Sequence, residues 1–489
     1  MSAEKPETRV QTVTEPLYIG MDVGGTKIQT SLIGESGKIY AFLKGRTPRG
    51  CTPETTIAEI QSSVERLLAE QGLEIGDLKS IGIAIPGVVE PDTGNIVVTP
   101  NMNLSGVPLG KILREYFGIP VAIGNDGNLG TLGETWLGAA RFAKSAVGIF
   151  VGTGVGSGMV LDGKLWYGAS YAAGEIGHIV AQVPARSWRE TLNLVDVKRK
   201  IKPPVCGCGN IGCLESIASR IAIEHAIQEA VASGVKSKIT ELSNGDLSIL
   251  RAGMLARALK SGDKLVTAVM QYTAEVLGYA CLTIRHLLDP EVILLGGGVM
   301  EACHKYLMPT IDKIIAEDKL PFAPSNRRVV LSSLGDDAVA LGAAALARAE
   351  VLHEHNVVAS VLRTLEYPAL SQDDDGNCRV NEELFDQDFV ILSDGTLEYR
   401  TPPLADAQNI KRKELMYVCG GTVQQLILTG RDIAQLSLTK KAAEYLRLRR
   451  IEVQILPLDK AIDVFNHSTL PRAAVFCIAK PVELPVEMS

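Results

Sequence analysis

Short apolar runs alternate along the first 350 residues with longer segments whose apolar positions recur every three or four residues. Runs of strand length occur at 17–23, 81–85, 121–123, 146–151, 158–161 and 291–295. Helical spacing occurs near 57–68 and over 214–233, 264–288 and 337–351. Because buried strands connected by helices form parallel sheets, this pattern predicts an α/β fold.

The pattern changes after residue 350. The stretch 353–381 is polar, carries three consecutive aspartates and has few periodic apolar positions, which indicates a linker or an irregular entry to a new domain. Beyond it, 425–429, 451–456 and 473–479 resemble strands, and helical spacing separates them at 439–448 and 459–466. These elements predict a further compact α/β unit of about 120 residues.

The composition argues against several classes of protein. The 489 residues carry 49 Lys and Arg against 56 Asp and Glu, and the resulting charge of −7 argues against general nucleic-acid binding. Residues 1–16 are polar and lack the apolar core of a signal peptide, and there is no run of about 18 apolar residues. We therefore expect a cytoplasmic protein that has neither nucleic acid nor a membrane as a partner.

Many of the 47 glycines gather in loops that follow predicted strands. The loop Asp22-Val23-Gly24-Gly25-Thr26-Lys27 combines two glycines, which let a ligand approach the backbone, with a hydroxyl and a positive charge. A second loop, 152–158, is also rich in glycine, and a glycine triplet occupies 296–298. None of these is a Walker or a Rossmann motif, and each alone is equally typical of a plain turn. Together they predict a phosphate-binding site.

A carboxylate follows the predicted strand 121–123 in the string Gly124-Asn125-Asp126-Gly127-Asn128. At the carboxyl end of a strand in an open α/β sheet, such a group faces the crevice in which ligands bind. In phosphoryl transfer, Asp126 could there accept a proton from a hydroxyl group. The competing interpretation is an Asx turn, which Asn-Asp-Gly strings often form.

Three cysteines are grouped at Cys206, Cys208 and Cys213, with glycines between them. Three thiolates and one imidazole make a closed tetrahedral set for a structural Zn²⁺ ion, and free thiols are the alternative. His178, in the string Gly-Glu-Ile-Gly-His, is the candidate for the fourth donor, and His225 and His286 are its alternatives.

These motifs together resemble the ROK family of sugar kinases and related repressors, within the actin-like ATPase superfamily. The resemblance covers about residues 16–350 and keeps the family's order of motifs. The motifs are DVGGTK at 22–27, IPGVV at 85–89, PNMN at 100–103, GNDGN at 124–128, GTGVGSG at 152–158, GEIGH at 174–178, CGCGNIGCLE at 206–215 and LGGGV at 295–299. The resemblance implies a two-lobed, ribonuclease H-like kinase fold with the active site in the cleft between the lobes. We expect a disordered tail at 1–16, an N-terminal lobe at 17–135 and a C-terminal lobe with the zinc motif at 136–350.

The resemblance also implies a role for each matching residue. Asp126 would be the catalytic base. The sugar would be held by Asn101, Asn125, Asp126, Glu175, His178 and Glu215. ATP and Mg²⁺ would be held by Asp22, Gly24, Gly25, Thr26, Lys27, Gly152, Thr153, Gly154, Gly297 and Gly298. A structural Zn²⁺ bound by His178, Cys206, Cys208 and Cys213 would brace the sugar site.

Two departures from the family pattern are visible. Gly124 and Gly127 flank the Asn-Asp pair where the family commonly has Glu and Ala, which suggests a looser loop. Between His178 and Cys206 lie 27 residues, more than the family's usual short spacer, and the insertion, around Trp188–Lys202, is basic. We expect it to be a solvated surface loop, and a lid or a subunit contact is the alternative.

Residues 426–480 resemble a different family, the Mth938-like domain, which is a small α/β module. We therefore expect a linker at 351–375 and a domain of that fold at 376–489. Arg431 and Asp432 follow Gly430 at the end of a predicted strand and are either pocket residues or part of a plain turn.

The leading functional prediction is ATP-dependent phosphorylation of glucose to glucose 6-phosphate by a homodimer or a higher homo-oligomer. Another hexose or an N-acetylhexosamine is the alternative substrate, and polyphosphate is the alternative donor. A sugar-responsive repressor is a different class, but such repressors carry a helix-turn-helix ahead of the DVGGTK loop, and 16 polar residues cannot form one. A non-catalytic scaffold is a third class, against which the presence of Asp126 argues.

Overall fold

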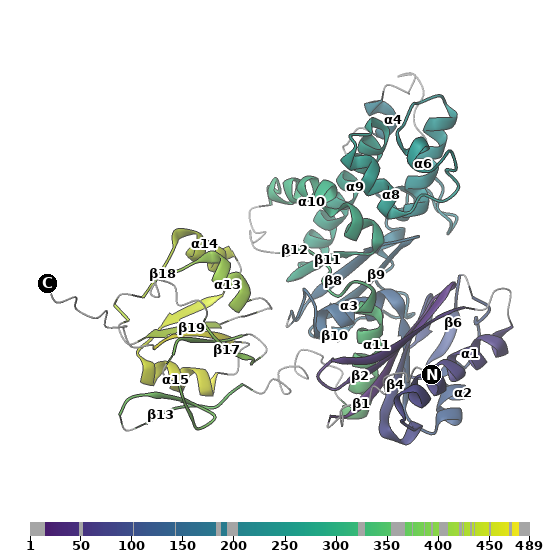
Figure 1. Cartoon of the computed structure of the whole chain (residues 1–489). Coiled ribbons are helices and arrows are strands. Elements are labelled where there is room, and N and C mark those ends of the chain that lie inside the picture. The colour runs from purple at the N-terminus through teal and green to yellow at the C-terminus, as the bar shows by residue number, and fades with distance from the viewer. Residues whose placement is uncertain are drawn as a thin grey trace, which may run out of the picture. The chain divides into compact units, whose positions relative to one another are not determined.

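The computed structural model describes residues 15–47, 52–100, 102–141, 143–181, 187–192, 204–320, 328–353, 367–373, 375–385, 387–392, 395–400, 409–419, 423, 425–430, 433–434, 436–448, 451–468 and 472–478. The chain forms two compact units, which divide near Val357 (Figure 1). The first contains two five-stranded sheets, and the second is built around another five-stranded sheet.

The first sheet of unit 1 has the strand order β3-β2-β1-β4-β7. Its strands are β1 (Leu17–Val23), β2 (Lys27–Gly34), β3 (Ile39–Arg46), β4 (Leu78–Ile85) and β7 (Val121–Asn125). Strand β2 is antiparallel to its neighbours β1 and β3, whereas β4 and β7 run parallel to β1. The carboxyl ends of β1, β4 and β7 therefore lie at one edge of the sheet, and the motif loops follow them.

Helices and a small hairpin complete this part of the unit. The elements are α1 (Pro53–Gln71), the 3-10 turn η1 (Ile75–Asp77), the hairpin β5 (Val88–Glu90) and β6 (Asn95–Val98), α2 (Leu109–Phe117) and α3 (Asp126–Trp136). Helix α1 begins with a proline at its first turn and ends at Gly72, whose positive φ of 68° favours glycine. Its buried face includes Ile57, Ile60 and Val64, as the helical spacing predicted.

The second sheet repeats the plan of the first, with the order β10-β9-β8-β11-β12. Its strands are β8 (Ala146–Val151), β9 (Val155–Leu161), β10 (Lys164–Leu165), β11 (Val292–Gly296) and β12 (Arg328–Leu331). Strands β11 and β12 run parallel to β8, and β9 is antiparallel to it. The loop 152–154 and the glycines after β11 therefore follow the carboxyl ends of neighbouring strands.

The remaining helices and 3-10 turns of unit 1 pack mostly around the second sheet. They are α4 (Trp188–Thr191), α5 (Glu215–Ala218), α6 (Arg220–Ala232), α7 (Ile239–Leu242), α8 (Ala252–Lys260), α9 (Lys264–Leu288), α10 (Gly298–Ala316) and α11 (Ala338–Leu352), with the 3-10 turns η2 (Ile176–His178) and η3 (Gly335–Asp337). Among the described helices, α9 alone is long and apolar enough to cross a membrane by length and composition. Its most apolar window is 67% buried inside the protein, so α9 is a core helix of this unit.

Helix α11 lies against the first sheet, although the predicted lobe limits put it in the second lobe. A Cβ atom on Gly20 would lie 2.0 Å from the carbonyl oxygen of Ala340, and one on Gly82 would lie 1.8 Å from that of Ala343. The helix backbone thus touches β1 and β4 directly. The predicted C-terminal lobe of 136–350 is corrected accordingly. The prediction failed because α11 contacts strands that lie more than 250 residues earlier in the sequence, and a local apolar pattern carries no information on such contacts.

The predicted helix 214–233 is two helices, α5 and α6. Ser219 separates them in an extended conformation, with φ −67° and ψ 158°, and its Oγ accepts a hydrogen bond from Ala222 N at 3.1 Å. Serine is a strong N-cap, so it starts a new helix. The apolar spacing continues across this break, which is why the pattern alone predicted one helix.

The start of the basic insertion is packed rather than solvated. Trp188 in α4 is only 6% exposed and belongs to the hydrophobic core around the second sheet. The Arg189 guanidinium lies 4.6 Å from the centre of the Trp188 ring and pairs with Glu229. The surface-loop prediction is therefore wrong for this segment, and the basic residues in 193–203 lie outside the described part of the chain.

Unit 2 has a central sheet of order β17-β16-β22-β19-β21, with hydrophobic clusters on its two faces. Its strands are β16 (Phe389–Ile391), β17 (Leu397–Tyr399), β19 (Gln425–Gly430), β21 (Glu452–Ile455) and β22 (Arg472–Cys477). The other elements are β13 (Leu370–Gln372), β14 (Cys378–Val380), β15 (Glu383–Phe385), β18 (Asn409–Ile410), β20 (Ser437–Leu438), α13 (Arg412–Val418), α14 (Lys440–Leu448) and α15 (Leu458–His467).

The predicted strands and helices of unit 2 are present, but its start differs from the prediction. Strand β13 lies inside the segment 351–375 that was predicted to be a linker, because a three-residue strand is too short to give an apolar pattern. The likeness to the Mth938-like domain stays a prediction, and Arg431 and Asp432 lie outside the described residues.

Candidate active site and metal site

A single large cleft in unit 1, with a volume of about 2560 Å³, brings the sequence motifs together. The predicted site residues that line it are Asp22, Lys27, Asn125, Asp126, Gly152, Thr153, Gly154, Glu175, His178, Cys206, Cys208, Glu215, Gly297 and Gly298. Gly24, Gly25 and Thr26 form the turn between Asp22 and Lys27, Cys213 is buried, and Asn101 lies outside the described residues.

The first glycine loop is the tight turn between β1 and β2. Gly24 N donates to Lys27 O at 2.9 Å, and Gly25, Thr26 and Lys27 are exposed. Asp22 is the penultimate residue of β1, beside this turn, with its side chain 14% exposed, and its Oδ2 lies 3.8 Å from Lys27 Nζ. Burial raises the pKa of Asp22 to about 6, while Lys27 lowers it and Asp126 raises it further. The turn thus places an exposed cation and a strongly perturbed carboxyl at the wall of the cleft.

Asp126 is the first residue of α3, directly after β7. Asn125 caps this helix by accepting from Asn128 N at 3.0 Å, and its Nδ2 donates to Asp126 Oδ1 at 3.1 Å. Gly127 N donates to the same Oδ1 at 2.9 Å. Burial raises the pKa of Asp126, the Gly127 hydrogen bond lowers it, and the nearby Glu175 carboxylate raises it. The alternative of an isolated Asx turn is wrong, since the string starts an 11-residue helix.

Gly127 tightens this site rather than loosening it. A Cβ atom at this position would lie 2.4 Å from the carbonyl oxygen of Ser157 in β9, so no larger side chain fits without movement. Gly158 faces α3 in the same way, with its Cβ position 2.6 Å from the Cα of Asn128. The two glycines therefore let α3 and β9 approach backbone to backbone, which fixes Asp126 against the second sheet. The expectation of a looser loop is corrected.

The second glycine loop joins β8 to β9 and contacts Glu215. Val155 N donates to Glu215 Oε2 at 2.9 Å, and Cys206 Sγ lies 3.7 Å from Glu215 Oε1. A Cβ atom on Gly154 would lie 2.4 Å from Glu215 Oε2, so a larger residue here would displace the Glu215 carboxylate. Glu215 therefore connects the loop that is predicted to bind phosphates with the loop that carries the cysteines.

The third glycine cluster forms the entry to α10. Gly297 is the residue before the helix and has a φ of 84°, which favours glycine. A Cβ atom here would lie 2.7 Å from Val151 O. Gly298 is the first residue of this 19-residue helix, so its amino-terminal end faces the cleft.

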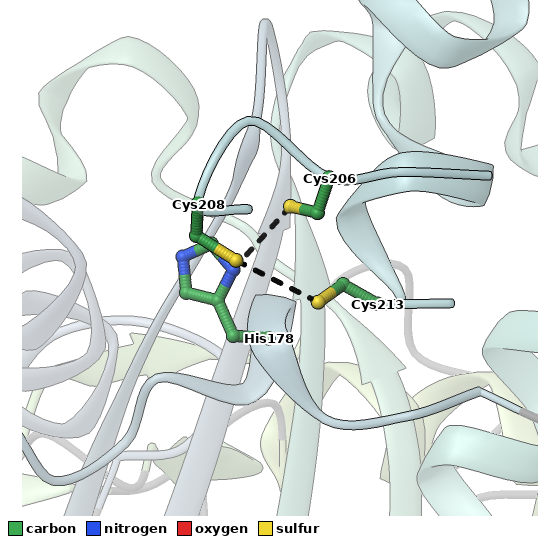
Figure 2. Close-up of side chains that lie close together, drawn as sticks. All are labelled: His178, Cys206, Cys208 and Cys213. Carbon is green, nitrogen blue, oxygen red and sulfur yellow. Dashed lines mark hydrogen bonds between the residues drawn. The ribbon is translucent and has the colours of Figure 1, made fainter. Parts of the chain in front are cut away.

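The four predicted metal donors meet at one point (Figure 2). The potential ligand atoms of His178, Cys206, Cys208 and Cys213 all lie within 4.8 Å of one another, whereas neither His225 nor His286 joins a described group of such donors. Cys208 Sγ and Cys213 Sγ are 3.8 Å apart, and Cys206 Sγ is 3.6 Å from His178 Nδ1. A tetrahedral Zn²⁺ with Zn–S of about 2.3 Å and Zn–N of about 2.0 Å requires separations of about 3.8 and 3.5 Å. The donor set therefore fits zinc.

The geometry also distinguishes the two nitrogens of His178. Nδ1 faces the thiols, whereas Nε2 lies 3.9 Å from Glu175 Oε2 at the cleft. The side chains of His178 and Glu175 are 35% and 51% exposed. One imidazole can thus bind a metal through Nδ1 and present Nε2 to a ligand in the cleft.

Two residues that the sequence analysis missed hold this site together. Ser157 Oγ donates to Gly174 O and accepts from Ile176 N at 3.0 Å, which fixes the loop that carries Glu175. The sequence could have indicated Ser157, because it lies within the glycine-rich motif at 152–158.

The second missed residue is Glu134, which is fully buried at the end of α3. Its carboxylate accepts from Ser332 Oγ at 2.6 Å and from Leu334 N at 2.8 Å. It thereby anchors the segment that leads from β12 to the cleft wall at Gly335. A single glutamate within a helix gives no sequence signal for such a role.

Comparison with known proteins identifies the class. The family model of the ROK family matches residues 18–350, and the chain belongs to this family. Its fold over these residues is the predicted two-lobed actin-like ATPase kinase fold. A glucokinase from Halalkalibacterium halodurans is 32% identical over 328 residues, which are 66% of this chain and 93% of that protein.

Relatives within the family include repressors as well as kinases. A xylose repressor from Caldicellulosiruptor bescii is 28% identical over 334 residues, which are 68% of this chain and 78% of the repressor. A crystal structure of a ROK family glucokinase from Streptomyces griseus, in complex with glucose and AMPPNP, superposes with a TM-score of 0.55 and 28% identity. It covers 68% of this chain and 99% of that one. Family membership alone therefore leaves the choice between kinase and regulator to the site.

Proposed function

We propose that this chain transfers the γ-phosphoryl group of ATP to a hexose, most simply to the 6-hydroxyl of glucose. The observation that carries the proposal is the placement of Asp126. Hydrogen bonds from Gly127 N and Asn125 Nδ2 hold its Oδ1, and these two bonds leave Oδ2 for a ligand. Because burial raises its pKa, the carboxylate is a stronger base than an exposed aspartate and accepts the hydroxyl proton as the phosphoryl bond forms.

The sugar side of the cleft supplies acceptors and donors for hydroxyl groups. Asn125, Glu175, His178 and Glu215 line it together with Asp126. Each has a hydrogen-bonded or ion-paired partner that restricts its rotation, such as Gly87 O for Asn125 Nδ2 at 3.0 Å. A rigid set of polar groups of this kind discriminates strongly against analogues that lack a hydroxyl. Another hexose or an N-acetylhexosamine is the alternative substrate for the same site.

The glycine loops would bind the nucleotide on the other side of the cleft. Gly24 N and Gly152 N are bonded within their own loops, so the exposed residues Gly25, Thr26 and Thr153 are the ones that would offer backbone N–H groups to phosphate oxygens. Lys27 adds a positive charge. Asp22 is the carboxylate positioned to face Mg²⁺, which prefers oxygen ligands. Gly297 and Gly298, at the amino-terminal end of α10, would lie near the adenosine. The glucokinase that was solved with AMPPNP supports this assignment by its similarity.

We assign a structural Zn²⁺ to His178, Cys206, Cys208 and Cys213, on the fit of their separations. When bound, the ion would tie the cysteine loop to the turn η2. His178 would then be fixed in one tautomer, with Nε2 directed to a sugar hydroxyl. Glu215 would link this braced region to Val155 and hence to the phosphate loop.

A direct assay tests the kinase assignment. Purified full-length protein is incubated with Mg²⁺ and ATP, or with Mg²⁺ and polyphosphate, in the presence of glucose, fructose, mannose, allose or N-acetylmannosamine. Sugar phosphate is quantified by mass spectrometry. We expect sugar-dependent formation of ADP and of hexose 6-phosphate. If no sugar supports ADP formation above the sugar-free rate, the proposed activity is wrong.

A sugar-responsive regulator is the second candidate, because repressors of the same family match this chain over a similar length. In that case the protein would bind a sugar without turning over ATP. Calorimetric binding of glucose together with a turnover rate at the sugar-free level would favour the regulator. Sugar-dependent binding to DNA fragments, tested under the same conditions, would establish it.

A further inference from the structure

The amino-terminal end of α6 is joined to the phosphate loop by backbone hydrogen bonds. Arg220 N donates to Gly152 O at 2.9 Å, and Ile221 N donates to Thr153 O at 3.5 Å. The Oγ of Ser219 caps the next N–H group, that of Ala222, at 3.1 Å. The first N–H groups of this helix are therefore occupied by the protein itself, so α6 fixes the loop instead of binding a phosphate.

The side chain of Arg220 reaches the same loop. Its NH2 donates to Thr153 Oγ1 at 3.3 Å, while its NH1 pairs with Glu224 Oε1. Glu224 is 6% exposed, and the same Oε1 accepts from Leu250 N at 2.8 Å. The guanidinium is thus held by a buried carboxylate on its own helix and directed at the hydroxyl of Thr153.

A guanidinium can only donate hydrogen bonds, so Thr153 Oγ1 is the acceptor in this contact. Its own proton is then free to point elsewhere, and Thr153 is exposed and lines the cleft. We propose that Arg220 is a positioning residue that holds the Thr153 hydroxyl as a hydrogen-bond donor to a phosphate oxygen of the nucleotide. This inference rests on the proposed kinase function, since the nucleotide supplies the acceptor.

The expected effect follows from the fork geometry of arginine. Arg220→Lys keeps a cation for Glu224, so the buried carboxylate retains a partner. A single ammonium group cannot reproduce both guanidinium contacts, the one with Glu224 and the one with Thr153. A hydrogen bond to a charged group is stronger than one between neutral groups, and orienting the Thr153 hydroxyl contributes only part of that bond. We expect the dissociation constant of Mg·AMPPNP to rise about 5- to 10-fold in Arg220→Lys. In Thr153→Val, which removes the hydroxyl, we expect a rise of at least that size.

A double-mutant cycle tests whether Arg220 acts through Thr153. Calorimetry gives the dissociation constant of Mg·AMPPNP for the wild type, Arg220→Lys, Thr153→Val and the double variant. Arg257→Met, an exposed arginine on α8, is the control for loss of a surface cation. We expect Arg220→Lys to weaken binding less than 2-fold when Thr153 is already valine.

Each outcome is decisive. Binding by Arg220→Lys within 2-fold of the wild type, or losses that multiply in the double variant, would overturn the role of Arg220. Failure of the wild type itself to bind Mg·AMPPNP would instead overturn the proposed kinase function. If Arg220→Lys does not fold, as judged by thermal unfolding, Arg220→Gln is measured in its place. Its neutral amide also tests whether the charge or the donor matters.

Discussion

The substitution Asp126→Asn gives the sharpest test of the proposed chemistry. An asparagine side chain has nearly the same shape, and its Oδ1 can still accept from Gly127 N and Asn125 Nδ2, which lie 2.9 and 3.1 Å away in the native site. The second carboxylate oxygen becomes an NH₂ group, which donates and cannot accept the hydroxyl proton. The change therefore removes the base and leaves the local structure in place.

The size of the effect follows from the usual contribution of a general base to the rate. General-base catalysis contributes about 10²- to 10⁴-fold, which corresponds to about 2.7–5.4 kcal/mol in the activation free energy. We expect kcat for glucose phosphorylation to fall by that factor. The dissociation constant of Mg·AMPPNP should change less than about 3-fold, because the glycine loops are not altered.

Thermal unfolding separates a loss of chemistry from a loss of structure. The folded protein raises the pKa of Asp126 above its unfolded value, so the native state binds a proton more readily than the unfolded chain does. At pH 7 the ionised carboxylate therefore costs folding free energy, and this cost grows as pH rises through the interval between the two pKa values. Asp126→Asn removes the charge, and we expect an unchanged or higher Tm at pH 7.

The assay couples ADP formation to NADH oxidation, with mass spectrometry of the sugar phosphate as an independent measurement. Asp246→Asn, in an exposed loop, is the matched control and should retain the wild-type rate. A variant Asp126→Asn with a kcat within 3-fold of the wild type would refute the assignment of the base. A large fall in Tm would show that the carboxylate has a structural role that the reasoning missed.

Three further predictions concern the metal, the nucleotide and the sugar loop. Cys206→Ser and His178→Ala should each lower the zinc content of the purified protein, measured by plasma mass spectrometry, well below one ion per chain. An unchanged zinc content in both variants would exclude the proposed four-donor zinc site. The affinity for Mg·AMPPNP should rise with pH through about 6, where buried Asp22 ionises. The nucleotide phosphate also titrates, so the pH profile of the wild type is compared with that of Asp22→Asn, and equal profiles would contradict the role of Asp22. Ser157→Ala, which frees the loop carrying Glu175, should raise KM for the sugar several-fold with little change in KM for ATP; equal changes in both would argue for a general loss of structure.

The sequence by itself determined most of the elements and the identity of the chemical groups. Strand β8 is continuously apolar, and β1 is apolar up to Asp22, because both faces of these strands are buried, and this property is local. The order of the glycine loops, the Asn-Asp pair and the cysteines also identified the family, because each motif needs specific residue types at short spacing.

The tertiary structure decided what depends on partners far away in the chain. Helix α11 packs on the first sheet because Gly20 and Gly82 let its backbone touch the strands, a contact that no local pattern encodes. Gly127 proved to be a close-packing residue because Ser157 lies against it. The choice of His178 over the other histidines likewise depended on where the chain brings the three thiols. Local periodicity thus specifies the elements, whereas the contacts that fix a side chain's direction and pKa exist only once the elements have packed.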